Sequence, residues 1–240
     1  MKAEVTYSDV AVYLPQEDAW RGQAIDVPDP QMPWAWGEYE MRNVEIPSEL
    51  IGYHPLWINT EFLRKAVLEE GYLSVGDCKF SSLYVNVKFL DLESLEIILV
   101  IAKNGFPICF KNKPEQAGKI KSGNFESHLE LLLSLKNVSG SFEEIVASKP
   151  LIQGTDLPDF WCRRDKNKHY IFFANPYSQN LRLPVQYDMA SSCGPSIIHI
   201  TINLYGKSID VTLDFVENQS LLMVVDHKGD YRFEDVTYHN

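Results

Sequence analysis

The chain has 240 residues, a hydrophobic content of 45% and a formal net charge of −11 at pH 7. This length allows one large domain or two small ones, and the apolar content excludes a largely disordered chain. The negative charge argues against a nucleic-acid-binding protein, because such proteins use basic surfaces to displace counterions from phosphates. It argues equally against an anionic membrane surface as a partner.

The first residues show no sign of a signal peptide, because Glu4 and Asp9 interrupt the apolar residues within 1–15. No run of about 18 apolar residues occurs, so we expect no membrane-spanning helix. The four cysteines are far apart and form no CxxC pair, which argues against a zinc ribbon. We expect no metal and no cofactor, and we expect Cys109 to be a buried free thiol in an apolar strand.

Residues 1–150 alternate apolar strands with amphipathic helices, which predicts an α/β domain with a parallel sheet. The expected strands are 9–15, 81–87 and 106–110, and the expected helices are 59–70, 91–105, 124–135 and 141–149. Asp91 is the predicted N-cap of the second helix, and Gly105 follows its end. Apolar residues at helical spacing, including Phe62, Leu63 and Leu133, are expected to face the sheet.

Between the first strand and the first helix lies a long acidic and aromatic loop, residues 16–58. Residues 1–60 contain ten Asp and Glu residues but three Lys and Arg residues. Four of the five tryptophans, Trp20, Trp34, Trp36 and Trp57, also fall in this loop. The loop shows neither a helical nor a strand period.

After residue 150 the hydrophobic period changes to two, which is typical of half-buried strands. The expected strands are 159–165, 169–175, 181–187, 198–204, 209–215, 220–226 and 231–236. Seven short strands joined by turns predict an antiparallel β-sandwich over residues 151–240. We expect the first two strands to form a hairpin, and we place a linker at 150–158.

The loop after the first strand of a parallel sheet is where ligands usually bind. Here it contains Glu17 and Asp18, which would repel phosphate, and the chain has no glycine-rich phosphate-binding motif. Cys109 lacks the flanking glycines of a nucleophile elbow. The acidic pairs Glu17/Asp18 and Glu38/Glu40 could serve glycoside hydrolysis by residue type. Adjacent acids in a loop are more often solvated, and that is the expectation here.

The aromatic residues allow two interpretations. Exposed rings with acids beside them, as in "WAWGEYE", can stack on sugars and accept hydrogen bonds from their hydroxyls. Alternatively, a long loop can pack its rings inward or against another domain. The candidate contact residues for carbohydrate or for a domain are Trp20, Trp34, Trp36, Glu38, Tyr53, His54 and Trp57. His54 also has the simpler interpretation of a structural histidine.

Several segments in this order carry a family resemblance: "DVAVYLPQEDAW", "PWAWGEYE", "GYHPLWIN", "CRRDKNKHYIFFANP" and "QSLLMVVDHKGDYRFEDV". The chain resembles the C-terminal region of large bacterial glycoside hydrolases of the α-L-rhamnosidase type, common in gut Bacteroidetes. The resemblance covers nearly the whole chain. It implies a flavodoxin- or amidotransferase-like α/β domain over 1–150, followed by a β-sandwich over 151–240. Enzymes of this type are often exported to the periplasm.

In such enzymes the catalytic carboxylates lie in a barrel that precedes this region, and no residue here matches them. The resemblance therefore implies a non-catalytic accessory region whose partner is a catalytic barrel domain or subunit. The alternative is a stand-alone module that binds a plant-type oligosaccharide or mediates oligomerisation. An exposed Trp-rich loop would favour contact with a sugar or partner, whereas buried rings would favour a plug.

Overall fold

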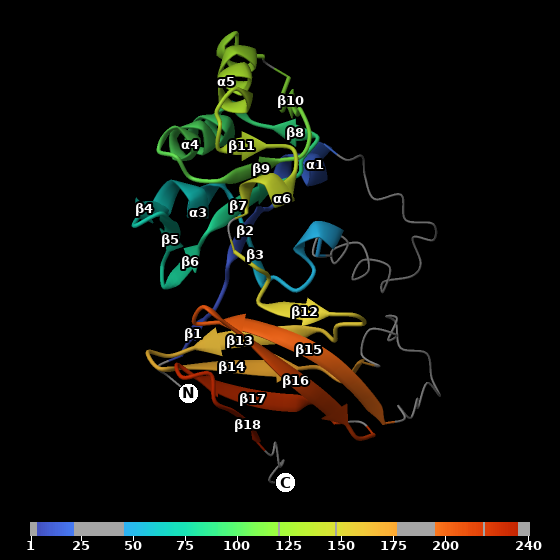
Figure 1. Ribbon diagram of the computed structural model, residues 1–240. Coiled ribbons are helices and arrows are strands. Elements are labelled where there is room, and N and C mark those ends of the chain that lie inside the picture. Colours follow the sequence, from blue (N-terminus) through green and yellow to red (C-terminus); the bar gives the residue numbers. More distant parts are fainter. Residues whose placement is uncertain are drawn as a thin grey trace, which may run out of the picture. The chain divides into compact units, whose positions relative to one another are not determined.

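The computed structural model describes residues 4–21, 46–119, 121–146, 148–176, 195–217 and 219–234 (Figure 1). The chain divides into two compact units, which we name after their sheets. The parallel-sheet unit consists of Ser8–Leu50 and Pro55–Ser148. The antiparallel unit consists of Met1–Tyr7, Ile51–His54 and Lys149–Asn240. Two short segments that we expected in the first domain thus belong with the second.

The parallel-sheet unit is built on five strands, all parallel, in the spatial order β11-β9-β7-β2-β3. The strands are β2 (Val10–Tyr13), β3 (Pro55–Ile58), β7 (Ser82–Val85), β9 (Ile108–Phe110) and β11 (Val138–Ser139). Every residue of β2, β7 and β9 is buried. Such fully apolar runs are typical of a parallel strand covered on both faces, and the three predicted strands are confirmed.

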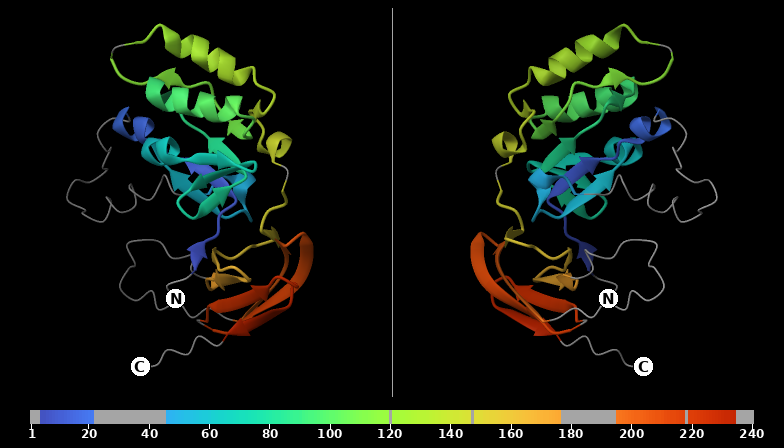
Figure 2. Two further views of the ribbon diagram at one scale, coloured as in Figure 1. Left: turned by 90° about the vertical axis from the view of Figure 1, so that its left-hand side faces the viewer. Right: turned by 90° about the vertical axis from the view of Figure 1, so that its right-hand side faces the viewer.

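Helices α3 (Thr60–Lys65), α4 (Leu92–Lys103) and α5 (Asn124–Leu133) share one hydrophobic core with the sheet. Figure 2 shows α4 and α5 side by side over this core. Asp91 caps α4 as predicted, since its carboxylate accepts the Ser94 N–H at 2.6 Å. The short α6 (Phe142–Ile145) packs against the other face, where the rings of Phe142 and Tyr84 meet edge to face.

The helix predicted over 59–70 is wrong beyond Lys65, where a small antiparallel sheet begins. Its strands are β4 (Val67–Glu69), β5 (Tyr72–Val75) and β6 (Cys78–Phe80). Glu70 and Gly71 both have positive φ, which makes the tight turn between β4 and β5 that ends any continuing helix. Phe62 consequently lies outside the core, with 49% of its surface exposed.

The remaining elements of this unit are short. They are α1 (Gln16–Arg21), η2 (Ser48–Leu50), β8 (Phe89–Leu90) and β10 (Glu115–Gln116), the last two paired in parallel. The helices α5 and α6 are shorter than predicted, and Leu133, expected to face inward, is 40% exposed at the end of α5. Residues 22–45, the middle of the Trp-rich loop, lie outside the described residues.

Two antiparallel sheets make up the described part of the antiparallel unit. The first contains β1 (Val5–Thr6), β13 (Phe160–Arg164), β14 (Lys168–Phe173), β17 (Leu221–Asp226) and β18 (Tyr231–Glu234), in that order. The second contains β12 (Ile152–Gly154), β15 (Ser196–Leu204) and β16 (Lys207–Phe215). Buried side chains from both sheets form one hydrophobic core.

The predicted alternation is confirmed in β15, where Ile198, Ile200, Ile202 and Leu204 are all buried. The predicted hairpin is also confirmed as the pair β13–β14. The predicted linker at 150–158 is wrong, because Leu151 and Ile152 are buried in the core and 152–154 form a strand. The strand predicted at 181–187 lies outside the described residues. The chain is thus a mixed fold that combines a parallel sheet with antiparallel sheets.

Candidate functional site

The strand order of the parallel sheet marks where a ligand would bind. Numbered along the chain, its strands lie in the order 2-1-3-4-5, so connections leave the first strand toward opposite sides. In doubly wound sheets, ligands occupy the crevice at this reversal, beyond the carboxyl ends of the strands. Here the corresponding position lies between β2 and β7, next to residues 14–18 and 86–89. We take this edge as the candidate site.

The carboxylate of Asp18 already occupies the backbone donors at this edge. One of its oxygens accepts the Phe89 N–H at 2.7 Å, and the other accepts the Lys88 N–H at 2.9 Å. Two adjacent amides after a strand are the groups that bind an anion in phosphate sites. In this chain an internal carboxylate satisfies them, so an anionic ligand would have to displace Asp18.

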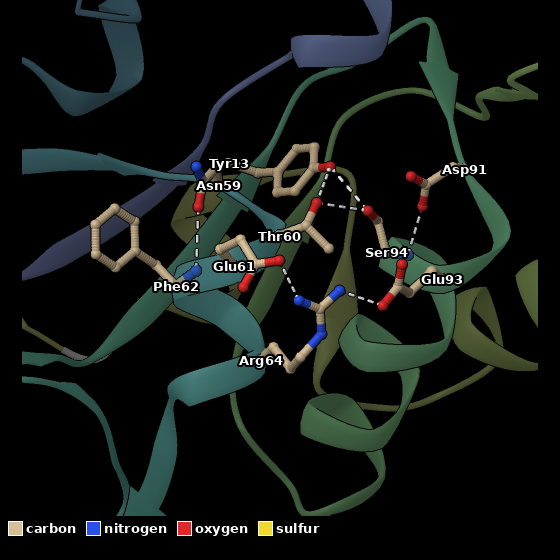
Figure 3. Close-up of polar contacts among 9 residues, drawn as sticks. All are labelled: Tyr13, Asn59, Thr60, Glu61, Phe62, Arg64, Asp91, Glu93 and Ser94. Atoms are coloured by element: carbon tan, nitrogen blue, oxygen red, sulfur yellow. Dashed lines mark hydrogen bonds and ion pairs between the residues drawn. The ribbon is translucent and has the colours of Figure 1, made fainter.

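A second group of polar side chains lies beside it (Figure 3). Tyr13 ends β2, and its hydroxyl lies 3.0 Å from Ser94 Oγ and 3.1 Å from Thr60 Oγ1. The Thr60 and Ser94 hydroxyls are themselves 2.8 Å apart. Glu17, from α1, completes the cluster with its Oε1 atom 2.9 Å from the Tyr13 hydroxyl. Tyr13, Glu17 and Ser94 are buried.

Burial alters the acidity of this cluster. Desolvation raises the pKa of Glu17 above its ordinary value, while its hydrogen bond with Tyr13 acts in the opposite direction. The nearby carboxylates of Asp91 and Asp18 raise it further. Burial also raises the pKa of Tyr13, which keeps its hydroxyl protonated. The expectation that Glu17 is a solvated loop acid is wrong, since only 3% of its surface is exposed.

Glu17 leads to a prediction, because its Oε2 atom is buried and has no hydrogen-bond partner in the described part of the chain. The pKa of the Glu17 carboxyl is higher in the folded protein than its unfolded value near 4.5, so this carboxyl stabilises the fold fully below pH 4.5. This contribution to the unfolding free energy is lost as pH rises through the folded-state pKa. Glu17→Gln keeps the shape but has no charge to bury. We therefore expect the variant to exceed the wild type in unfolding free energy at pH 8.

The measurement is urea unfolding at pH 5 and pH 8, with hydrogen exchange assigning the loss to the parallel-sheet unit. Glu93→Gln is the matched control, because Glu93 makes an exposed ion pair with Arg64 on α3. Identical pH dependence in the wild type and in Glu17→Gln would contradict a raised pKa of Glu17.

Asp18 leads to a separate prediction. Asp18→Ala leaves two backbone N–H groups without their acceptor, and charge-assisted hydrogen bonds contribute about 1 to 3 kcal/mol. We expect a loss of that size in the unfolding free energy. Because the freed amides form an anion site, added sulfate should stabilise Asp18→Ala more than the wild type. Equal sulfate effects on both proteins would refute this role for Asp18.

On the opposite face of the sheet, Glu49 and Lys111 form an ion pair with Nζ and Oε1 2.6 Å apart. Lys111 lowers the pKa of Glu49, and the Tyr84 hydroxyl lies 3.3 Å from the same Oε1 atom. Cys109 is fully buried next to them, and burial raises the pKa of its thiol to about 12. A thiol of this kind is not ionised at neutral pH and is a poor nucleophile. The expectation of a buried free thiol is confirmed.

The described candidate contact residues, Tyr53, His54 and Trp57, are divided between the two units. His54 is buried in the antiparallel unit, where its Nδ1 atom lies 2.6 Å from the Tyr7 carbonyl and its Nε2 atom accepts the Cys162 N–H at 3.2 Å. Both ring nitrogens therefore serve the fold. Tyr53 is buried beside it, whereas Trp57 is partly exposed in β3 of the other unit.

The other candidate residues cannot be placed. The backbone of Trp20 lies in α1. Trp34, Trp36 and Glu38 lie outside the described residues. The residues at the crevice, Tyr13, Thr60 and Ser94, were not among the candidates. Tyr13 ends the predicted first strand, whereas Thr60 begins α3 after β3, a strand that was not predicted, and Ser94 lies in the first turn of α4.

Within the described ranges, no group of three or more His, Cys, Asp or Glu side chains is placed to hold a metal ion. The helices described are also too short or too polar to cross a membrane. A scan of the sequence against protein-family models finds no match, and a search of curated proteins finds none.

Proposed function

We propose that this chain is a non-catalytic accessory region of a rhamnosidase-like glycoside hydrolase, which supports a separate catalytic barrel. In this proposal the parallel-sheet unit is a flavodoxin- or amidotransferase-like domain and the antiparallel unit is a β-sandwich. The observation that carries the proposal is the candidate site itself. The donors and acceptors at the crevice bind one another, with Asp18 on the Lys88 and Phe89 amides and Tyr13 on Thr60 and Ser94.

The two units also fit the order of domains that the resemblance implies. A parallel sheet with the strand order 2-1-3-4-5 precedes two antiparallel sheets that share a core. The raised pKa of Glu17 would suit a general acid, but this carboxyl is buried against Tyr13 instead of lining an open cleft. A group that substrate does not reach is better suited to holding α1 on the sheet.

The first experiment measures hydrolysis of aryl α-L-rhamnosides by the purified chain. We expect a rate equal to that of the heat-denatured protein. A rate that Glu17→Gln or Glu38→Gln abolishes would overturn the proposal. The second experiment co-expresses the chain with a rhamnosidase-type barrel encoded directly upstream, if the gene neighbourhood contains one. The chain should then raise the melting temperature and the activity of that barrel, and no effect on either would argue against a supporting role.

A second function, binding of an oligosaccharide, is favoured by one observation in the antiparallel unit. Trp161 and Phe172 face each other across β13 and β14, with 47% and 40% of their surfaces exposed. The His54 ring packs edge-on against the Trp161 ring at 4.7 Å, which fixes its orientation. Fixed, exposed aromatic rings offer a flat apolar surface to the C–H face of a sugar.

Titration of plant oligosaccharides while recording tryptophan fluorescence tests this second function. Trp161→Ala and Phe172→Ala should each weaken binding if these rings are the contact. Binding that survives both changes would point to the tryptophans of the loop. The absence of any fluorescence change across a broad panel would count against carbohydrate binding.

A further inference from the structure

Among the described residues, β18 is the outermost strand at one edge of the five-stranded sheet. The opposite edge is β1, which has two residues, whereas β18 has four residues and all four side chains are exposed. Among the described residues, no strand pairs with the outer side of β18. An open edge presents unpaired N–H and C=O groups to any strand that can align with it.

The hydrogen bonds of the turn before β18 show which backbone groups face outward. The Asp226 N–H donates to the Asp230 carbonyl at 3.0 Å. Backbone groups in an antiparallel pair face the partner at every second residue. The groups of Arg232 and Glu234 therefore face β17, and those of Tyr231 and Phe233 face the open edge.

The charged and the aromatic side chains of β18 lie on opposite faces of the strand. Arg232 and Glu234 lie on one face, where Arg232 Nη2 is 2.6 Å from Glu234 Oε1. Tyr231 and Phe233 lie on the other face, with ring centroids 6.1 Å apart and 42% and 39% of their surfaces exposed. A strand that pairs with this edge would meet a charged row on one face and two rings on the other.

We propose that β18 pairs with β18 of a second copy of this chain, antiparallel about a two-fold axis perpendicular to the sheet. Such an axis keeps each residue on its own face, so charged residues can oppose charged residues only. One register centred on Arg232 places Arg232 opposite Arg232 and Glu234 opposite Asp230, which are like charges. The register centred on Phe233 places Arg232 opposite Glu234 twice.

The charges therefore select the register centred on Phe233. The Arg232 and Glu234 pairs then occupy positions without backbone hydrogen bonds between the copies, where side chains approach most closely. The two Phe233 backbones exchange hydrogen bonds, and their rings become cross-strand neighbours on the other face. The two five-stranded sheets join into one continuous sheet. This pairing is independent of the proposed function, because it uses none of the residues at the crevice.

Sedimentation velocity over a concentration series tests the pairing, and we expect a reversible dimer. Arg232→Glu and Glu234→Arg each replace two attractive cross-strand pairs by two repulsive ones, and each should raise the dimer Kd by about tenfold or more. An equimolar mixture of these two variants restores opposite charges at both pairs. The mixture should therefore form a heterodimer with an affinity close to that of the wild type.

The heterodimer also shows that both variants are folded, so a loss of dimer cannot be attributed to misfolding. Asp214→Arg is the matched control, because it makes the same charge change as Glu234→Arg at an exposed position on the other sheet. It should leave the Kd unchanged. The inference is overturned if the wild type stays monomeric at the highest concentration, if either β18 variant dimerises as well as the wild type, or if mixing restores nothing.

Discussion

Gly52→Ala is expected to prevent stable folding of the antiparallel unit. Gly52 has a φ of +85°, and a Cβ atom built on it would lie 2.0 Å from the Ile152 carbonyl oxygen. That oxygen belongs to a strand in the core, and the Ile152 N–H donates to the Gly52 carbonyl at 2.9 Å. Neither backbone can move without breaking this bond. We expect a loss of at least about 3 kcal/mol in unfolding free energy, at the severe end for a single substitution.

Gly71→Ala is the matched control, because Gly71 has a φ of +81° and nothing lies within 4 Å of its added Cβ. Gly71→Ala should lower the unfolding free energy by about 1 to 2 kcal/mol, which is the strain of a left-handed backbone conformation at a residue with a Cβ atom. Urea unfolding of both variants separates the steric effect from the conformational one. Equal losses in the two variants would show that the contact with Ile152 has no consequence.

The second large loss of stability is expected when the pH is lowered. His54 and His169 are both buried in the antiparallel unit, and desolvation lowers the pKa of each to about 4. Both imidazoles regain an ordinary pKa near 6.5 on unfolding, so the unfolded chain binds more protons between those values. The stability that the neutral rings confer is complete above pH 6.5 and is lost as pH falls from 6.5 to about 4. The expected loss is about 3 kcal/mol for each histidine.

This window separates the histidines from Asp165 and Asp226, whereas the raised pKa of Glu17 acts above pH 4.5 with the opposite sign. Asp165 and Asp226 have lowered pKa values because of hydrogen bonds from backbone N–H groups, so their effect comes at a lower pH. Urea unfolding at half-unit steps from pH 7.5 to pH 4 gives the slope of stability with pH. His54→Gln should reduce that slope, because one of the two buried imidazoles no longer titrates. An unchanged slope in His54→Gln would rule out a buried neutral imidazole.

The spacing of hydrophobic residues predicted the helices and strands well where the buried side chains follow a regular pattern along the element. The fully buried strand at 82–85 and the alternating strand at 196–204 were both visible in the sequence, because local pattern and final environment agree there. The helix at 59–70 failed at Ala66 because the turn at Glu70 and Gly71 outweighs helical spacing. Residues 67–80 then pair with each other, and a helical period cannot reveal such pairing.

The candidate site was harder to predict for a physical reason. Asp18 binds amides about 70 residues away, and Tyr13 meets Ser94, which lies 81 residues further along the chain. Such contacts depend on strand order, which the period of a single strand does not encode. The two adjacent acids at 17 and 18 looked like solvated residues because they lie in a long segment with neither a helical nor a strand period. Their neighbours in space are a buried tyrosine and two backbone amides.

The path of the chain between its units limits how this protein can evolve. The backbone passes from one unit to the other after Tyr7, Leu50, His54 and Ser148, so neither unit is a continuous stretch. A recombination event that copied residues 149–240 alone would leave behind His54, the acceptor of the Cys162 N–H. It would also leave behind β1, which pairs with β13. Residues 149–240 copied alone would therefore give an incomplete antiparallel unit.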